Sequence, residues 1–382
     1  MVHPTIVVIR TYIKLPRRTS WMSAILVECQ VPGIPPKIEE LEDLARSRGY
    51  FVLKKLIQRR GKPDAAYVIG RGKLAELKRL VMETGADNVI FANTLKAGQA
   101  FRIRRELGWR VNVIDRNLLV LEIFEQRAMT KEAKLQIELA RLRYTLPWAR
   151  EFVRYRNLYG EQVGFSAMGE YLHKVYEANA RRRIKALKEE LRKARLKTFL
   201  RVKKRHEAGL PVVSLTGYTQ AGKTTFFNLV AGESKPVGLG LFTTLSTFAR
   251  RISIEGMDFI IVDSIGFIED LHPLILDAFH ATLSEIGMSD AILLIIDASD
   301  PPDILRRKVS SSKEVLYRVA PGLPLIIALN KVDLVGEEGL EAGRRVVEDL
   351  FPSTPIIPIS ARRGDHVEEV LLKLKELLMN LS

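Results

Sequence analysis

The sequence predicts an α/β protein in which two parallel-sheet regions are joined by a basic helical segment. Three observations lead to this prediction. Strand-sized apolar runs alternate with helical patterns over residues 22–150, and the same alternation returns after Gly209. Between these regions lies a long stretch with helical spacing and a strong excess of basic residues. With 382 residues, of which 47% are hydrophobic, the chain is long enough for two or three domains with buried cores.

The first region, residues 22–150, has the alternation of strands and helices that is typical of βαβ units. We expect strands at 24–27, 50–57, 88–91 and 110–114, and helices at 36–48, 73–84 and 98–107. From residue 118 to about residue 156 the pattern becomes helical. Residues 1–21 fit no element, so they are either a loose extension or precede a translation start at Met22.

The middle region, residues 151–208, is predicted to be a basic helical hairpin and linker. Its segment 174–205 contains fourteen basic and three acidic residues, so it carries most of the net charge of +15. Apolar residues recur there at helical spacing, which predicts one or two long helices with a broad cationic face. Because almost all of these charges are positive, we interpret this face as a phosphate-binding surface. The alternative is a solvated helix packed on its neighbour.

The last region, residues 209–382, repeats the alternation more regularly. We expect strands at 210–215, 257–262, 291–296, 324–329 and 356–359, with helices between them, including 224–230 and 367–379. Each strand ends near a polar residue. Ligands of open α/β sheets bind at the carboxyl ends of the strands, so we expect the site at this edge.

A glycine-rich motif, G-x-x-x-x-G-K-T, lies between the first of these strands and the following helix. Such a loop holds phosphates with its backbone N–H groups and with the helix N-terminus. Lys223 brings a positive charge to the β- and γ-phosphates, and the Thr224 hydroxyl coordinates Mg²⁺. We name residues 217–224 the phosphate loop; its members are Gly217, Tyr218, Thr219, Gln220, Ala221, Gly222, Lys223 and Thr224.

A second motif, over residues 330–333, is predicted to select the base. The Asp333 carboxylate can accept from the N1–H and the exocyclic amine of guanine, a donor pair that adenine lacks. The stem of Lys331 can lie over the ring, and Asn330 can tie this loop to the phosphate loop. We name this segment the base loop and expect GTP rather than ATP as its ligand. The expected base contacts are Asn330, Lys331, Val332 and Asp333, with Ser360, Ala361 and Arg362 after the last strand.

Two further segments are predicted to contact the γ-phosphate and Mg²⁺. Asp263 should hold the metal through a water molecule, and the Gly266 N–H should meet the γ-phosphate. We choose Thr244 as the hydroxyl that completes the Mg²⁺ coordination begun by Thr224. Such segments usually switch conformation with the nucleotide. The residues concerned are Phe242, Thr243, Thr244, Leu245 and Ser246, and Asp263, Ser264, Ile265 and Gly266.

Composition excludes several classes of protein. The single cysteine, Cys29, excludes a disulfide framework and fits a reducing compartment. No apolar run approaches the roughly 18 residues that cross a bilayer. A pI near 9.8 points to an acidic partner, with nucleic acid first and an anionic membrane second. We therefore expect a soluble cytoplasmic protein.

The ordered motifs resemble the HflX subfamily of translational GTPases. The segment after Gly266, with Phe267 and Ile268, is similar to that family, as are the turn at 70–73 and the V-I-D-R at 113–116. The resemblance covers about residues 22–382. It implies an HflX-type N-terminal domain, a basic hairpin and a Ras-like P-loop GTPase domain. It also implies Mg²⁺-dependent GTP hydrolysis, a partner in the large ribosomal subunit and its rRNA, no membrane partner, and a monomer.

Three departures qualify what the resemblance implies for catalysis and partners. Phe267 stands where many GTPases place a water-orienting Gln, so Lys223, Thr244 and Gly266 should support only slow hydrolysis without a partner. Gln220 replaces an Asn that helps to bind a monovalent cation in related GTPases. The glycine-rich turn before the basic hairpin is reduced to Gly160, Gly164 and Gly169.

Two alternatives to a ribosome-associated GTPase stay open. The turn at 70–73 could be a second nucleotide loop, which would make the protein an RNA-remodelling ATPase. The GTPase could also act on another RNA or on a protein. Aromatic residues that could stack on unpaired bases are Trp109, Trp148, Tyr155 and Tyr159.

Overall fold

The computed structural model describes residues 22–128, 130–158, 166–207, 209–233, 248–263, 266–267, 272–275 and 286–381, with backbone only for 152–158, 166–176, 198–199 and 201–207. The expected extension at 1–21 therefore lies outside the described residues. The chain forms two compact units. One comprises Met1–Gln126 with Leu135–Glu190, and the other Arg127–Lys134 with Leu191–Ser382.

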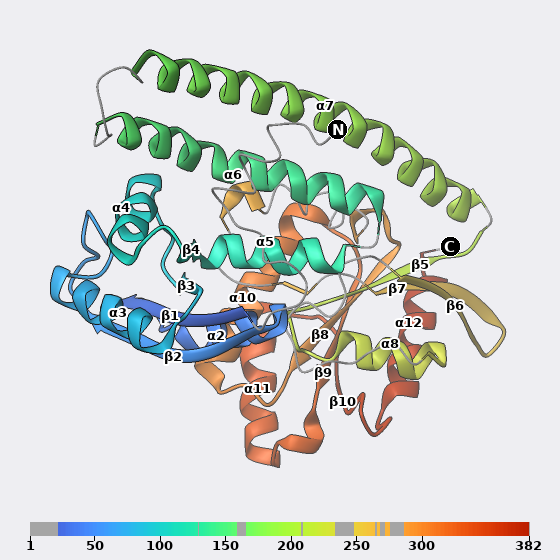
Figure 1. Cartoon of the computed structure of the whole chain (residues 1–382). Coiled ribbons are helices and arrows are strands. Elements are labelled where there is room, and N and C mark those ends of the chain that lie inside the picture. Colours follow the sequence, from blue (N-terminus) through green and yellow to red (C-terminus); the bar gives the residue numbers. More distant parts are fainter. Residues whose placement is uncertain are drawn as a thin grey trace. The chain divides into compact units, whose positions relative to one another are not determined.

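The N-terminal unit is built on a four-stranded parallel sheet with the order β2-β1-β3-β4 (Figure 1). The strands are β1 Met22–Gln30, β2 Tyr50–Arg59, β3 Asn88–Phe91 and β4 Asn112–Asp115. The strands β3 and β4 are buried along their whole length, as expected for a parallel sheet covered on both faces. The helices of this unit are α2 Ile38–Arg48, α3 Arg71–Thr84, α4 Ala97–Leu107 and α5 Arg116–Arg127.

Two long helices, α6 (Lys131–Leu158) and α7 (Ser166–Glu207), run side by side (Figure 1). They are antiparallel, because Glu138 accepts both guanidinium bonds of Arg183 and Glu177 pairs with Arg150. The helical pattern expected from residue 118 to about residue 156 forms two helices, α5 and α6, because the Thr130 hydroxyl accepts the Ala133 N–H at 3.1 Å and starts a new helix. Residue 151, where the middle region was expected to begin, lies inside α6.

The C-terminal unit contains a six-stranded sheet with the order β10-β9-β8-β5-β7-β6. Its strands are β5 Val212–Thr216, β6 Phe248–Ile254, β7 Met257–Asp263, β8 Ala291–Asp297, β9 Leu325–Asn330 and β10 Ile356–Ile359. Only β6 is antiparallel among these, and the sequence analysis missed it. Its arginines, Arg250 and Arg251, point into solvent at the sheet edge and obscure its apolar alternation.

Four helices of the described residues belong to this unit together with its sheet. They are α8 Lys223–Ala231, α10 Pro302–Val319, α11 Glu337–Leu350 and α12 Val367–Met379, with the short 3₁₀ turns η1 Ile286–Met288 and η2 Val332–Leu334. The core packs Phe226, Phe227 and Phe259 against apolar residues of the central strands. The α/β class with a parallel sheet and a P-loop domain is thus confirmed. Among the described helices, none is both long and apolar enough to cross a membrane.

Candidate nucleotide-binding site

The phosphate loop leaves β5 and enters α8 at the carboxyl edge of the sheet. Its two glycines have left-handed backbones, with φ of 141° at Gly217 and 100° at Gly222. A Cβ atom on Gly217 would lie 2.1 Å from the Ile295 carbonyl oxygen, and one on Gly222 would lie 2.1 Å from Asn330 Nδ2. Both positions therefore require glycine, and the loop is pressed against β8 and the base loop.

Lys223 begins α8 and is buried, with only 6% of its surface exposed. Its Nζ donates to the carbonyl oxygens of Gly217 at 3.0 Å and of Tyr218 at 2.6 Å. Burial lowers the pKa of Lys223 to about 8, although the Asp263 carboxylate acts in the opposite direction. A partly desolvated ammonium at a helix N-terminus is well suited to bind an anion.

Thr224 and Asp263 place two hard oxygen donors beside the phosphate loop. The Thr224 hydroxyl donates to Asp263 Oδ2 at 3.3 Å, and the two residues are 8% and 0% exposed. Hydroxyl and carboxylate oxygens are the ligands that Mg²⁺ prefers, directly or through water. The donor set at this position therefore fits Mg²⁺.

The end of the D-x-x-G motif lies directly on the phosphate loop. Phe267 N–H donates to the Gly217 carbonyl at 2.9 Å, and Thr219 N–H donates to the Phe267 carbonyl at 2.8 Å. A Cβ atom on Gly266 would approach Lys223 Nζ to 2.9 Å. Phe267 is buried at 4% exposure, so no polar side chain occupies this position.

Asn330 joins three segments of the site. Its Nδ2 donates to the Ala221 carbonyl at 2.7 Å, and its Oδ1 accepts the Ala361 N–H at 2.9 Å. Ser360 Oγ donates to Asp333 Oδ1 at 2.7 Å, and this bond lowers the pKa of Asp333. The base loop, the phosphate loop and the segment after β10 are thereby fixed relative to one another, with Asp333 ionised.

Three further residues of the predicted site are described by the structure, and the others are not. Gln220, in the phosphate loop, has a left-handed φ of 65°. Val332 is the first residue of η2. The Arg362 side chain is exposed, and its positive charge helps to lower the pKa of Asp333. The remaining predicted contacts lie outside the described residues; they are Phe242, Thr243, Thr244, Leu245, Ser246, Ser264 and Ile265.

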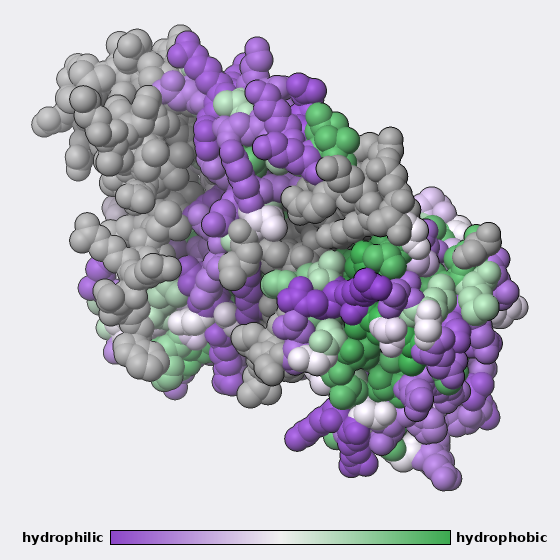
Figure 2. All heavy atoms as spheres, turned by 90° about the vertical axis from the view of Figure 1, so that its right-hand side faces the viewer, coloured by the Kyte–Doolittle hydropathy of each residue, from purple (hydrophilic) through white to green (hydrophobic). Residues whose placement is uncertain are grey.

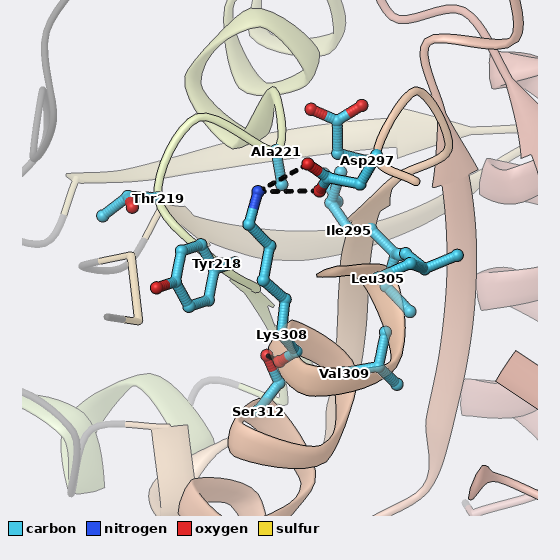
Figure 3. Close-up of a pocket in the computed structure, with 11 residues that line it drawn as sticks. Tyr218, Thr219, Ala221, Ile295, Asp297, Leu305, Lys308, Val309 and Ser312 are labelled. Atoms are coloured by element: carbon cyan, nitrogen blue, oxygen red, sulfur yellow. Dashed lines mark hydrogen bonds and ion pairs between the residues drawn. The ribbon is translucent and has the colours of Figure 1, made fainter. Parts of the chain in front are cut away.

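Sequence reasoning named Lys331 but missed three charged residues near it, Asp297, Asp300 and Lys308, which line a pocket beside this site (Figure 3). Lys331 pairs with Asp297 at the end of β8, and Lys308 of α10 pairs with Asp300 at 2.7 Å. The Lys308 ammonium also lies 5.2 Å from the centre of the Tyr218 ring. The only signal in the sequence was that Asp297 follows a buried strand of the same sheet.

The turn at 70–73 is engaged within its own unit. Gly70 N–H donates to Gln58 Oε1 at 2.8 Å, and Arg60 lies over the Gly70 backbone. Lys73 pairs with Glu76 at 2.9 Å on the first turn of α3. These contacts are those of a structural turn.

The described part of α7 displays its basic residues to solvent, while Leu187 and Leu191 are buried. In Figure 2 the upper part of the view, where α7 lies in Figure 1, is mostly hydrophilic where it is described. Of the aromatic candidates, Trp109 is 53% exposed and Trp148 is buried. The side chains of Tyr155 and Tyr159 lie outside the description. The exposed basic residues are Arg181, Arg182, Arg183, Lys185, Lys188, Arg192, Lys193, Arg195 and Lys197.

Three family models match consecutive parts of the chain. A GTP-binding GTPase N-terminal model matches residues 36–125, and a GTP-binding GTPase middle-region model matches residues 127–205. A 50S ribosome-binding GTPase model matches residues 212–331. Together these models cover most of the sequence.

Similar proteins include three archaeal relatives that carry the name GTPase HflX. The protein of Thermococcus kodakarensis is 41% identical over 90% of this chain and 78% of its own length. The relative from Thermofilum pendens is 43% identical over 86% and 77%, and that from Hyperthermus butylicus is 39% identical over 90% and 92%.

Among solved structures, a GTP-binding protein from Sulfolobus solfataricus in complex with GDP is similar to this chain. It has a TM-score of 0.53 and 30% identity, over 94% of this chain and 99% of that chain. A crystal structure of SsGBP with GDP gives a TM-score of 0.55, 30% identity and the same coverage.

Proposed function

Since this chain belongs to the HflX family of GTPases, we propose that it binds and hydrolyses GTP while associated with the large ribosomal subunit. Nucleotide state would switch its affinity for the subunit and its rRNA. The observation that carries the proposal is the assembly of Lys223, Thr224, Asp263 and Asn330 at one sheet edge.

The residues of the phosphate loop bind and orient the triphosphate. The α8 N-terminus and the Lys223 ammonium would bind the β- and γ-phosphates, and the burial of Lys223 at the start of α8 supports this role. Thr224 and Asp263, with Thr244, would hold Mg²⁺, which neutralises phosphate charge when bound. Asp333, ionised and fixed by Ser360, selects guanine by accepting its two donors. The GDP-bound relative supports the choice of base.

Hydrolysis by the isolated protein should be slow. The buried Phe267 has no group that could orient the attacking water, and its backbone is held on the phosphate loop. The Gly266 N–H remains the proposed contact for the γ-phosphate. A partner that orders this segment or supplies a polar group would accelerate turnover.

The large subunit is the partner that the remaining observations support. The exposed basic residues of α7 form a cationic face, and rRNA offers a dense array of phosphates. The family model over residues 212–331 carries the description of a 50S ribosome-binding GTPase. The cationic face of α7 lies outside the residues of the nucleotide site, so it supports the partner separately.

GTP turnover with and without purified large subunits tests the proposal. We expect large subunits to raise turnover at least about tenfold, because they supply what Phe267 cannot. Sedimentation with a GTP analogue, GDP or no nucleotide should show the most co-sedimentation with the analogue. The proposed association with the large subunit would be contradicted if GTP turnover were the same with and without subunits and co-sedimentation were equal with the GTP analogue, with GDP and without nucleotide. A calorimetric preference for GDP over ADP tests the guanine site separately.

Charge reversal on α7 tests the RNA contact. Changing Arg182, Lys185, Lys188 and Lys193 to Glu should weaken binding to the subunit and flatten its salt dependence. The matched control reverses four exposed arginines of α10 and α11, namely Arg306, Arg318, Arg344 and Arg345. Equal losses in both variants would remove α7 from the interface.

A further inference from the structure

Strand β8 ends at a carboxylate that the proposed function does not use. Asp297 is the last residue of β8, and its register partner on β9 is Asn330, the first residue of the base loop. The next residue, Ala298, donates its N–H to the Asn330 carbonyl at 2.8 Å. The sheet therefore places this carboxylate beside the base loop.

The Asp297 carboxylate is held in one orientation. Its Oδ1 accepts the Ser299 N–H at 3.0 Å and the Ser299 hydroxyl at 2.6 Å. Its Oδ2 accepts the Lys331 ammonium. The side chains of Asp297 and Lys331 are only 13% and 29% exposed, so solvent screens this ion pair less than a surface pair.

Lys331 has a backbone conformation that a lysine rarely adopts. Its φ is 69°, which lies in the left-handed region, where the Cβ atom comes too close to the following carbonyl oxygen. Such outliers persist where the surroundings determine them, and they are common at binding sites. The ion pair with Asp297 holds the side chain of this residue, Lys331 Nζ, at the end of β8.

A second ion pair, between Lys308 and Asp300, lies beside Asp297 (Figure 3). Lys308 Nζ lies 2.7 Å from both oxygens of Asp300, as the dashed lines from Lys308 show, and faces the Tyr218 ring. Burial raises the pKa of Asp300, with Lys308 and Lys331 lowering it and Asp297 raising it, so the four charges influence one another. Lys308 neutralises Asp300, which would otherwise compete with Asp297 for Lys331.

We propose that Asp297 is a positioning residue for guanine recognition, which fixes the Lys331 side chain before the base arrives. This inference rests on the proposed guanine-nucleotide site. The stem of Lys331 would then meet the ring without first losing its rotamer freedom. Asp297 itself does not touch the nucleotide.

The test compares GDP binding by the full chain and its Asp297→Asn variant, using fluorescent GDP. We expect affinity to fall about tenfold, mainly through faster dissociation, because pre-organisation is lost. Competition by inorganic pyrophosphate, which has no base, should change less than about twofold. The matched control is Asp349→Asn, which removes the same charge from the exposed pair with Arg306 and should leave both measurements unchanged.

A double-mutant cycle separates positioning from a general structural effect. Lys331→Met keeps an apolar stem but removes the charge, so adding Asp297→Asn to it should change GDP affinity less than about twofold. If Asp297→Asn does not fold, Ser299→Ala is used instead, and it should weaken GDP binding about three-fold, because it removes the hydroxyl bond that helps to orient the Asp297 carboxylate.

Three results would overturn the inference. They are GDP affinity within twofold of the wild type in Asp297→Asn, an equal loss in the Lys331→Met background, and an equal loss for pyrophosphate. Wild-type protein that binds no GDP would instead refute the proposed function and the inference with it.

Discussion

The two sheets of this protein have the same kind of topology but use their carboxyl edges differently. In each sheet the chain reverses its winding direction, between β1 and β3 in the N-terminal sheet and between β5 and β8 in the C-terminal sheet. Ligands of open α/β sheets bind at such points. The phosphate loop occupies the second of them. At the first, the Asn93 side chain bonds to both the N–H and the carbonyl of Cys29, at 2.7 and 2.9 Å.

Each unit also has a turn with glycine and lysine at the start of a helix, at residues 70–73 and in the phosphate loop, and the two turns differ in burial and crowding. Lys223 is buried and donates to the loop carbonyls of Gly217 and Tyr218, whereas Lys73 is partly exposed and paired with Glu76. Gly222 is left-handed and packed against Asn330, while the space around Gly72 is open. A glycine and a lysine at a helix start therefore indicate a phosphate site only where the fold buries the cation and crowds the glycine.

The largest effect should come from adding one methyl group to each turn. Gly222→Ala places Cβ 2.1 Å from Asn330 Nδ2 at a φ of 100°, so GDP affinity should fall more than about 100-fold. Gly72→Ala meets no atom within 4 Å in a helix, so it should stabilise the unit by about 0.5–1 kcal/mol and leave binding unchanged. GDP titration and thermal melting measure both. Similar GDP affinities of the Gly222→Ala and Gly72→Ala variants would contradict the conclusion that only the turn at Gly222 is a phosphate site.

Removing the two lysines should give the next largest difference. Lys223→Ala removes the cation expected at the β- and γ-phosphates, so GTP turnover with large subunits should fall about 100-fold. Lys73→Ala breaks only a pair with Glu76 at the surface, so turnover should stay within about twofold. An ATPase activity that survives Lys223→Ala and disappears in Lys73→Ala would restore the second-nucleotide interpretation of the turn at 70–73.

The third comparison is between Asn330 of the base loop and Asn93 of the N-terminal unit, since the side chain of each bonds to the backbone of other segments. Asn330→Ala leaves the Ala361 N–H and the Ala221 carbonyl without their partner, so GDP affinity should fall about tenfold as the loops loosen. Asn93→Ala should lower the free energy of unfolding by about 1–2 kcal/mol and leave GDP affinity unchanged. Denaturant unfolding and GDP titration of both variants would show whether Asn93 has a purely structural role.

Sequence patterns predicted the sheet-forming strands and the residues at their ends, because motif spacing and strand ends reflect local chain properties. They missed β6, whose Arg250 and Arg251 face solvent, and the interruption at Thr130, where a hydroxyl cap divides two helical patterns. They also missed the pairing of Asp297 with Lys331, because that contact depends on the register of β8 on β9. Contacts set by register and side-chain orientation are not encoded in the periodicity of one segment.

The smallest predicted effect is the pH dependence of nucleotide binding, which distinguishes a buried lysine from an exposed one. Burial lowers the pKa of Lys223 to about 8 in the nucleotide-free protein, and bound phosphates should raise it. Binding above pH 8 is therefore linked to proton uptake, and GDP affinity should fall about eightfold between pH 7.5 and 9.

The same shift has the opposite sign for folding of the nucleotide-free protein. Because the folded pKa of Lys223 lies below the unfolded value of 10.5, the folded state binds fewer protons between pH 8 and 10.5. Burial of the ammonium then costs on the order of 3 kcal/mol below pH 8, and this cost is relieved as the pH rises.

Lys223→Arg provides the control for the pH dependence of GDP binding. Its guanidinium stays charged throughout this pH range, and the titration of guanine itself affects both proteins equally. Calorimetry at pH 8.5 in buffers of different ionisation enthalpy should show proton uptake in the wild type that the arginine variant lacks, and identical pH profiles would mean that Lys223 does not titrate in this range.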